Sequence, residues 1–155
     1  QKQPAATIDL LPTFAAIVGA KAPELPIDGL DIRPLLFGEP DAHSPHEALF
    51  FYYADGQLQS MRSGSWKLMF PHTSRTMNGQ APGHDGVPGK YRNLAVGLEL
   101  YDLDSDVGET MNLAAEKPEV VAKLQAMADV MRGRLGDKLT KHAPTEVRPA
   151  ETAAD

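Results

Sequence analysis

Apolar residues recur at helical spacing in two segments of the chain. The first spans residues 9–19, and its apolar positions are Leu10, Leu11, Phe14, Ile17 and Val18. Asp9 precedes this run as a predicted N-cap, and Gly19 follows it as a predicted stop. The second begins at Pro118, ends before Gly136, and carries its apolar stripe at Val120, Leu124, Met127, Met131 and Leu135. The pattern predicts a short amphipathic helix near the N-terminus and a longer one near the C-terminus.

Between these helices, short β-prone segments alternate with turn signals. Four strands are predicted, at residues 48–53, 58–62, 66–70 and 98–103. Asp55-Gly56 and Ser63-Gly64 are turn dipeptides that join the first three strands. Residues 32–37 favour one helical turn inside a connector rich in Pro and acidic residues. The predicted fold class is therefore α+β, with a small antiparallel sheet of about four strands that the C-terminal helix covers.

A glycine-rich stretch interrupts the strand pattern at residues 71–97, and we predict no regular structure there. His72 and Arg75 lie at its start, where the third predicted strand ends. A His that can donate a hydrogen bond and an Arg whose planar fork matches a sulfate or a carboxylate are what the wall of an anion pocket needs. The alternative is that His72 bonds backbone groups and Arg75 pairs with a surface carboxylate.

Composition and charge narrow the function classes. The 155 residues carry 15 Lys+Arg against 21 Asp+Glu, a net charge of −6 with no dense basic block, which argues against binding to nucleic acid or to an anionic membrane surface. Apolar runs stay far below the about 20 residues that span a bilayer. No Cys is present, so this chain encodes no disulfide, thiolate metal site or thiol nucleophile. It starts at Gln1, so we expect a processed product or a fragment.

Two clusters suggest metal binding, and neither passes closer inspection. The alternating carboxylates of residues 102–109 suggest a calcium loop, but Val107 replaces the required Gly and Leu113 the required bidentate carboxylate, so we interpret a solvated acidic turn. His43 and His46 are three residues apart, but Pro45 between them disfavours a helix, so we interpret a solvated loop and not a zinc site. No serine stands in a nucleophile motif; Ser63-Gly64-Ser65 is interpreted as a turn.

Four sequence blocks together resemble a known family. They are residues 9–13 (DLLPT), 28–38 (DGLDIRPLLFG), 61–68 (MRSGSWKL) and 100–113 (LYDLDSDVGETMNL). Their order and spacing closely resemble the C-terminal part of type I, arylsulfatase-like sulfatases. The likeness covers about residues 6–140, departs at Val107 where the family usually has Pro, and at residues 70–75 looks like a bacterial branch.

The resemblance implies a sulfuric ester hydrolase of the alkaline-phosphatase-like superfamily. Such enzymes use a formylglycine made from the Cys or Ser of a Cys/Ser-x-Pro-x-Arg motif, together with a calcium ion held by Asp and Asn side chains. Neither the motif nor an N-terminal strand that carries paired aspartates occurs in this chain, so we predict no catalytic residue and no metal ligand in it. What carries over is a substrate-binding role for His72 and Arg75, with residues 76–97 as a candidate specificity element. Relatives are often exported, so a periplasmic or extracellular location is expected.

The resemblance also implies a division of the chain. Residues 1–45 would be the last helix and connector of the large α/β catalytic domain, residues 46–140 a C-terminal antiparallel-sheet subdomain, and residues 141–155 a tail. On this hypothesis the chain packs on the N-terminal catalytic domain, shapes the pocket for a sulfate ester, and is inactive alone. Leu10, Phe14 and Ile17 should then be partly exposed when the chain stands alone.

Two other hypotheses stay open. The chain could be a stand-alone, non-catalytic binder of sulfated glycans, although its positive charge is sparse. It could also be a truncated product with no separate activity. Neither the particular sulfate ester nor the oligomeric state follows from the sequence.

Overall fold

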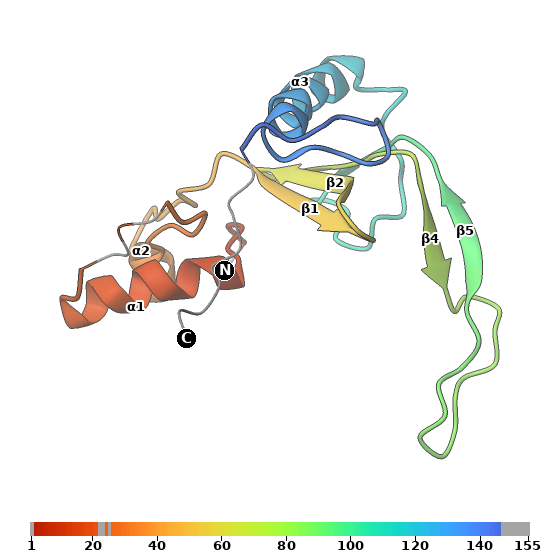
Figure 1. Cartoon of the computed structure of the whole chain (residues 1–155), viewed down its shortest axis with the longest axis horizontal. Coiled ribbons are helices and arrows are strands. Elements are labelled where there is room, and N and C mark those ends of the chain that lie inside the picture. Colours follow the sequence, from red (N-terminus) through yellow and green to blue (C-terminus); the bar gives the residue numbers. More distant parts are fainter. Residues whose placement is uncertain (1, 22–23, 25, 147–155) are drawn as a thin grey trace, which may run out of the picture. The chain divides into compact units, whose positions relative to one another are not determined.

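The computed structural model describes residues 2–21, 24 and 26–146. Its elements, labelled in Figure 1 where there is room, are the 3-10 helix η1 (Thr7–Asp9), α1 (Leu10–Val18), α2 (Arg33–Leu36), β1 (Leu49–Tyr53), β2 (Gln57–Ser63), β3 (Trp66–Met69), β4 (His72–Thr76), β5 (Arg92–Val96), β6 (Glu99–Asp102) and α3 (Pro118–Leu135). They fall into two compact units. The helical unit is Gln1–Leu49 and the sheet unit is Phe50–Asp155.

The helical unit contains the short helix that the apolar spacing predicts. Asp9 precedes α1, and Gly19 ends it in the left-handed region with φ of 68°. The single turn predicted at residues 32–37 is also confirmed, as α2 with Pro34 in its first turn.

One side of α1 is apolar and lies open. The apolar face of α1 consists of Leu10, Leu11, Phe14, Ile17 and Val18. Leu10 is 39%, Phe14 53% and Ile17 45% exposed. The expectation of partial exposure at these three positions is therefore confirmed, and this face buries little within the described residues.

The other side of α1 holds the segment that leads to α2 through polar groups. The fully buried Asp9 accepts a hydrogen bond from the Leu30 amide at 2.9 Å, and the buried Thr13 hydroxyl accepts one from the Ile32 amide at 3.0 Å. Gly29 passes so close that an added Cβ would stand 1.9 Å from the Ile8 carbonyl oxygen. Asp9, Thr13 and Gly29, which belong to the first two sequence blocks, thus hold the segment before α2 against α1.

The sheet unit is built on four strands in the order β1-β2-β3-β6. β3 pairs antiparallel with both β2 and β6, and the register places Met61 opposite Leu68 and Leu68 opposite Leu100. All three side chains are fully buried, and α3 packs against β2 to cover them (Figure 1). The predicted α+β class, with an antiparallel sheet of about four strands and a covering C-terminal helix, is confirmed.

The face that α3 buries differs from the predicted stripe. Its buried positions are Val121, Leu124, Ala128 and Arg132. Leu135, which was expected to be buried, is exposed. The cause is Arg132, whose guanidinium lies 4.4 Å from the centroid of the Phe70 ring and is paired with the buried Asp137. Because Arg132 is paired, it can occupy a core position that a prediction from apolar residues alone gives to neighbouring residues of α3.

The prediction that residues 71–97 lack regular structure is wrong at both ends of the stretch. β4 and β5 pair antiparallel from His72 opposite Val96 to Thr76 opposite Arg92, forming a separate two-stranded sheet. Only residues 77–91 remain as the connecting loop. β5 is exposed along most of its length, so this hairpin gains little from core packing, which is why its apolar content did not mark it as strands.

The segment after β6 covers the open edge of that strand. Asn112 accepts a hydrogen bond from the Leu100 amide at 3.0 Å, and the Leu113 amide donates to the Leu100 carbonyl at 2.8 Å. Asp106 accepts bonds from the Thr110 and Met111 amides at 2.7 and 2.8 Å. The last part of the sequence block at residues 100–113 thus forms a turn that covers the edge of β6 and protects the sheet from pairing with another chain.

The last described residues return to α3. The amides of Thr145 and Glu146 both donate to the Arg134 carbonyl. The tail predicted for residues 141–155 falls in its last nine positions outside the described residues. Within the described ranges, no helix has both the length and the apolar character needed to cross a membrane.

Candidate functional site

The hairpin of β4 and β5 carries both residues that the sequence nominates for substrate binding. His72 is the first residue of β4 and Arg75 the fourth. Side chains alternate along a strand, so residues three apart point to opposite faces. The structure therefore places His72 and Arg75 on one strand but does not bring them together.

His72 is buried where the hairpin begins, and its ring is bonded to the backbone. Its Nδ1 lies 2.7 Å from the Phe70 carbonyl oxygen. A carbonyl can only accept, so Nδ1 carries the proton and only Nε2 is left for another partner. This backbone bond is the arrangement that the alternative interpretation of His72 expects.

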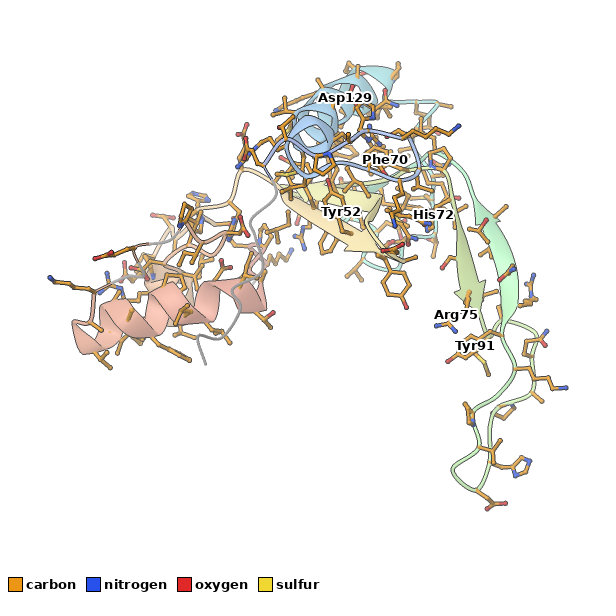
Figure 2. All side chains as sticks on the ribbon, in the orientation of Figure 1. Tyr52, Phe70, His72, Arg75, Tyr91 and Asp129 are labelled. Atoms are coloured by element: carbon orange, nitrogen blue, oxygen red, sulfur yellow. The ribbon has the colours of Figure 1, made fainter. Side chains whose placement is uncertain are left out.

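Arg75 is exposed and lies over an aromatic ring. Its guanidinium carbon is 5.0 Å from the centroid of the Tyr91 ring, within the range of a cation–π contact. Figure 2 shows Arg75 and Tyr91 together toward the loop end of the hairpin, with His72 near the opposite end of β4. The sequence pattern did not predict a site role for Tyr91, although its position between Lys90 and Arg92 in a glycine-rich stretch was a usable signal.

The hairpin differs in charge from the rest of the chain. Residues 72–96 carry Arg75, Lys90 and Arg92 against Asp85, a net charge of +2 in a chain whose net charge is −6. Arg92 also donates from Nε to the Asn78 carbonyl at 3.0 Å, which ties the loop to the strands. A hairpin with positive charge and an exposed aromatic ring, on an otherwise acidic chain, can attract and orient an anionic ligand.

His46 does not lie in the solvated loop that was predicted for it. Its Nε2 lies 2.6 Å from Oδ1 of Asp9, and both side chains are almost fully buried. Burial raises the pKa of Asp9, but hydrogen bonds from the Leu30 and Ala6 amides and the contact with His46 together lower it below its ordinary value. His43, by contrast, is exposed in a loop, as predicted. The prediction failed for His46 because Asp9 and His46 lie 37 positions apart in the sequence and meet only in the fold.

The carboxylates of the acidic turn after β6 bond groups of the chain itself. Besides the Asp106 bonds already described, Asp102 accepts from the Asp104 amide at 3.2 Å, and Glu109 pairs with Lys67 at 2.7 Å. The sequence predicts a solvated acidic turn here, and the structure shows one whose carboxylates also bond neighbouring groups of the chain. Among the described residues, no group of three or more His, Cys, Asp or Glu side chains is placed to hold a metal ion.

Comparison with known proteins gives consistent matches. A family model described as the C-terminal region of aryl-sulfatase matches residues 44–152. The chain is 32% identical to arylsulfatase A of Homo sapiens, covering 97% of this chain and 30% of that protein. It is 32% identical to steryl-sulfatase of Mus musculus, with 95% and 25% covered, and 30% identical to a sulfatase of Formosa agariphila, with 72% and 19% covered.

Among solved structures, one similar chain has a TM-score of 0.56 at 22% identity, with 84% of this chain and 26% of that chain covered. Its description concerns the metabolism of multiple glycosaminoglycans by Bacteroides thetaiotaomicron. This likeness shows a shared fold. The chain spans 30% or less of the length of the curated relatives named above. Because these relatives are both mammalian and bacterial, the resemblance to a bacterial branch of the family stays a prediction.

Proposed function

The chain belongs to the sulfatase family, as the C-terminal region of an aryl-sulfatase, and from that premise we propose that it docks on a catalytic region and helps to shape the pocket for a sulfate ester. The catalysed reaction would be hydrolysis of that ester. Residues 1–45 would complete the catalytic domain, and residues 46–140 would form the subdomain that borders its pocket.

The reactive groups of such an enzyme would lie outside this chain. In the family, a formylglycine supplies the oxygen nucleophile and a calcium ion withdraws charge from the sulfate. The residues here fit neither group. The sequence has no Cys and no Ser in a Ser-x-Pro-x-Arg motif, and the carboxylate of Asp106, in the most acidic turn, already accepts hydrogen bonds from the amides of Thr110 and Met111. The contribution of this chain is therefore docking and substrate contact.

The apolar face of α1 is the observation that carries this proposal. Five apolar side chains stand exposed on a helix of nine residues, whereas contiguous apolar patches on soluble proteins mark interaction surfaces. Fully burying a side chain such as Leu, Ile or Phe contributes about 1.5–3 kcal/mol. The partner that fits is the catalytic region of the same enzyme, because the curated relatives carry most of their length outside the matched part.

The hairpin supplies the substrate contacts in this proposal. Arg75 is exposed and can meet a sulfate through its planar fork, while residues 77–91 form a long loop at the end of the strands. His72 can reach a substrate only through Nε2, because Nδ1 is bonded to Phe70. These roles apply when the catalytic region is present.

A second candidate is a non-catalytic binder of sulfated glycans. The specific observation in its favour is the positive charge of residues 72–96, combined with the exposed ring of Tyr91 beside Arg75. The two candidates differ in whether hydrolysis requires this chain.

We expect no sulfate release by the pure chain of 155 residues. The reason is that the sequence holds no Cys, and no Ser in the motif from which the family makes formylglycine. The measurement is hydrolysis of 4-nitrophenyl sulfate with and without added calcium, followed by the absorbance of 4-nitrophenol. Saturable, calcium-dependent turnover that survives repeated purification would contradict the proposal.

A further inference from the structure

The hairpin of β4 and β5 continues the pairing of β3 and β6. Met69 of β3 lies opposite Glu99 of β6, and His72 of β4 lies opposite Val96 of β5. The second pair is three residues further along one strand and three residues back along the other, so both pairs belong to one register. The strands are interrupted only at residues 70–71 and 97–98. The two sheets therefore share one long antiparallel pair of segments with a break in it.

The break itself is weakly held at Pro71 and Gly97. Pro71 has no backbone N–H to donate to a ladder, and the continued register sets it opposite Gly97. Both residues are exposed, and apart from its chain neighbours no described heavy atom lies within 4 Å of the place that a Cβ on Gly97 would occupy. Packing at these two positions therefore does not fix the angle between the hairpin and the four-stranded sheet.

Phe70, the residue next to Pro71, is held from three directions. Its amide donates to the Gln59 carbonyl of β2 at 2.9 Å, which ties its backbone to the sheet. Its buried ring lies 4.4 Å from the guanidinium carbon of Arg132 on α3. Its carbonyl accepts a hydrogen bond from His72 Nδ1 at 2.7 Å, across Pro71 (Figure 2). Phe70 thus connects the sheet, α3 and the first residue of the hairpin.

Arg132 is in turn fixed by a buried charge. Its Nε donates to Oδ2 of Asp137 at 3.0 Å, and the side chain of Asp137 is completely buried. A well-packed apolar residue often serves the stability of a core at least as well as a buried ion pair does. Covering the sheet therefore does not by itself explain an arginine at position 132, whereas holding the Phe70 ring under a planar cation does.

From these contacts we propose that Phe70 and Arg132 are positioning residues of the hairpin. They set the direction in which the hairpin leaves the sheet, and they hold His72 with Nδ1 protonated and Nε2 open. Neither residue touches a substrate. The consequence for the reaction rests on the proposed function: the two residues keep His72 and Arg75 where a sulfate ester meets them, so α3 acts on substrate binding through Phe70.

Residual dipolar couplings of the backbone amides in the chain of 155 residues test this positioning. They report the direction of each N–H bond, so the couplings of β4 and β5 fit the alignment of β2 and β3 only if the hairpin keeps one angle to the sheet. We expect this fit in the unaltered chain. Arg132→Lys keeps a charge for Asp137 but loses the planar group over Phe70, so the hairpin should lose the fit while β2 and β3 keep it. Phe70→Leu should have the same effect, and Arg134→Lys, the same change at a half-exposed position of α3, is the matched control that should keep the fit.

The ring of His72 gives a second readout. With the ring neutral, long-range ¹H–¹⁵N correlation spectra distinguish a protonated Nδ1 from a protonated Nε2. We expect a protonated Nδ1 in the unaltered chain and in Arg134→Lys, and a mixture of the two tautomers in Arg132→Lys. A role in stability alone would lower the midpoint of unfolding and leave both the tautomer and the fitted couplings of the folded chain unchanged.

Hairpin couplings that still fit the alignment of the sheet in both Arg132→Lys and Phe70→Leu would overturn the proposal, and so would an unchanged His72 tautomer in both. In a polypeptide in which this chain follows a catalytic region, we expect Arg132→Lys to raise KM for 4-nitrophenyl sulfate about tenfold with kcat nearly unchanged, and Arg134→Lys to leave both within about twofold. An unchanged KM in a variant whose hairpin has lost the fit would contradict the substrate contacts of the proposed function and leave the positioning role standing.

Discussion

Replacing Asp137 by Ala lowers the expected free energy of unfolding of the sheet unit by about 3–5 kcal/mol. The carboxylate is completely buried, and its Oδ2 accepts hydrogen bonds from Arg132 Nε at 3.0 Å and Thr140 Oγ1 at 2.9 Å. Its Oδ1 accepts from the backbone amides of Leu58 and Leu139 at 3.2 and 2.9 Å. Alanine would leave the buried guanidinium of Arg132 and the amides of Leu58 and Leu139 without this acceptor. Removing one partner of a buried ion pair destabilises a protein strongly, because the other partner stays buried.

The measurement is urea unfolding followed by far-ultraviolet circular dichroism. Asp129→Ala is the matched control, because Asp129 pairs with the same Arg132 at 2.8 Å but its side chain is 66% exposed. That variant should lose less than about 1 kcal/mol, as is usual for exposed ion pairs. Equal losses for the two variants would show that burial does not set the strength of this network.

The same network sets a pH dependence. Burial raises the pKa of Asp137. Hydrogen bonds from the Leu139 and Leu58 amides, Thr140 and Arg132 lower it by more, so the pKa lies below its ordinary value of 3.8. A lowered folded pKa contributes stability that is fully present above 3.8 and is lost as pH falls through the folded value. Acid titration of the Asp137→Asn variant should lack this loss.

Replacing Asp9 by Ala has the largest expected effect in the helical unit. Its carboxylate accepts the Leu30 amide at 2.9 Å, the Ala6 amide at 2.8 Å and His46 Nε2 at 2.6 Å. Each buried donor left without a partner costs about 1–3 kcal/mol. Without Asp9, the segment that leads to α2 loses its main connection to α1. We therefore expect this segment to open locally, in addition to a lower midpoint of the unfolding transition.

Amide hydrogen exchange at Leu30 and Ile32 reports this opening directly. We expect exchange there to accelerate roughly 100-fold or more, since each 1.4 kcal/mol corresponds to a factor of ten. Asp31→Ala is the control, because Asp31 pairs with Arg33 at 2.7 Å on a partly exposed surface and should change exchange only slightly. Unchanged exchange at Leu30 in the Asp9 variant would show that its carboxylate does not hold the segment.

The sequence predicts elements well where local pattern decides them. α1, with Gly19 as its stop, and the strands around Gly56 and Gly64 are set by apolar spacing and by turns with positive φ, so their positions are confirmed within about two residues. The buried face of α3 could not be predicted in this way. Arg132 reaches the core only because Asp137 and Phe70 meet it there, and those contacts arise from tertiary packing.

The candidate site shows the same division. His72 and Arg75 are recognisable as polar residues at the end of a strand, but the faces to which they point depend on a hairpin that apolar content does not reveal. Tyr91 lies 16 positions from Arg75 and joins it only through strand register. The pair of Asp9 and His46 was hidden for the same reason, because its members are brought together by non-local folding.

The docking role of α1 is the central claim, and sulfate release tests it most directly. The protein to use is a polypeptide in which this chain follows a catalytic region carrying Cys/Ser-x-Pro-x-Arg. Phe14→Asp would place a charge in the docked face, and Val107→Asp is the matched control, since Val107 is 85% exposed in the acidic turn. We predict that Phe14→Asp lowers hydrolysis of 4-nitrophenyl sulfate about 100-fold or more, because burying an unpaired charge costs several kcal/mol, while Val107→Asp leaves it unchanged. Equal hydrolysis by the two variants would contradict the account.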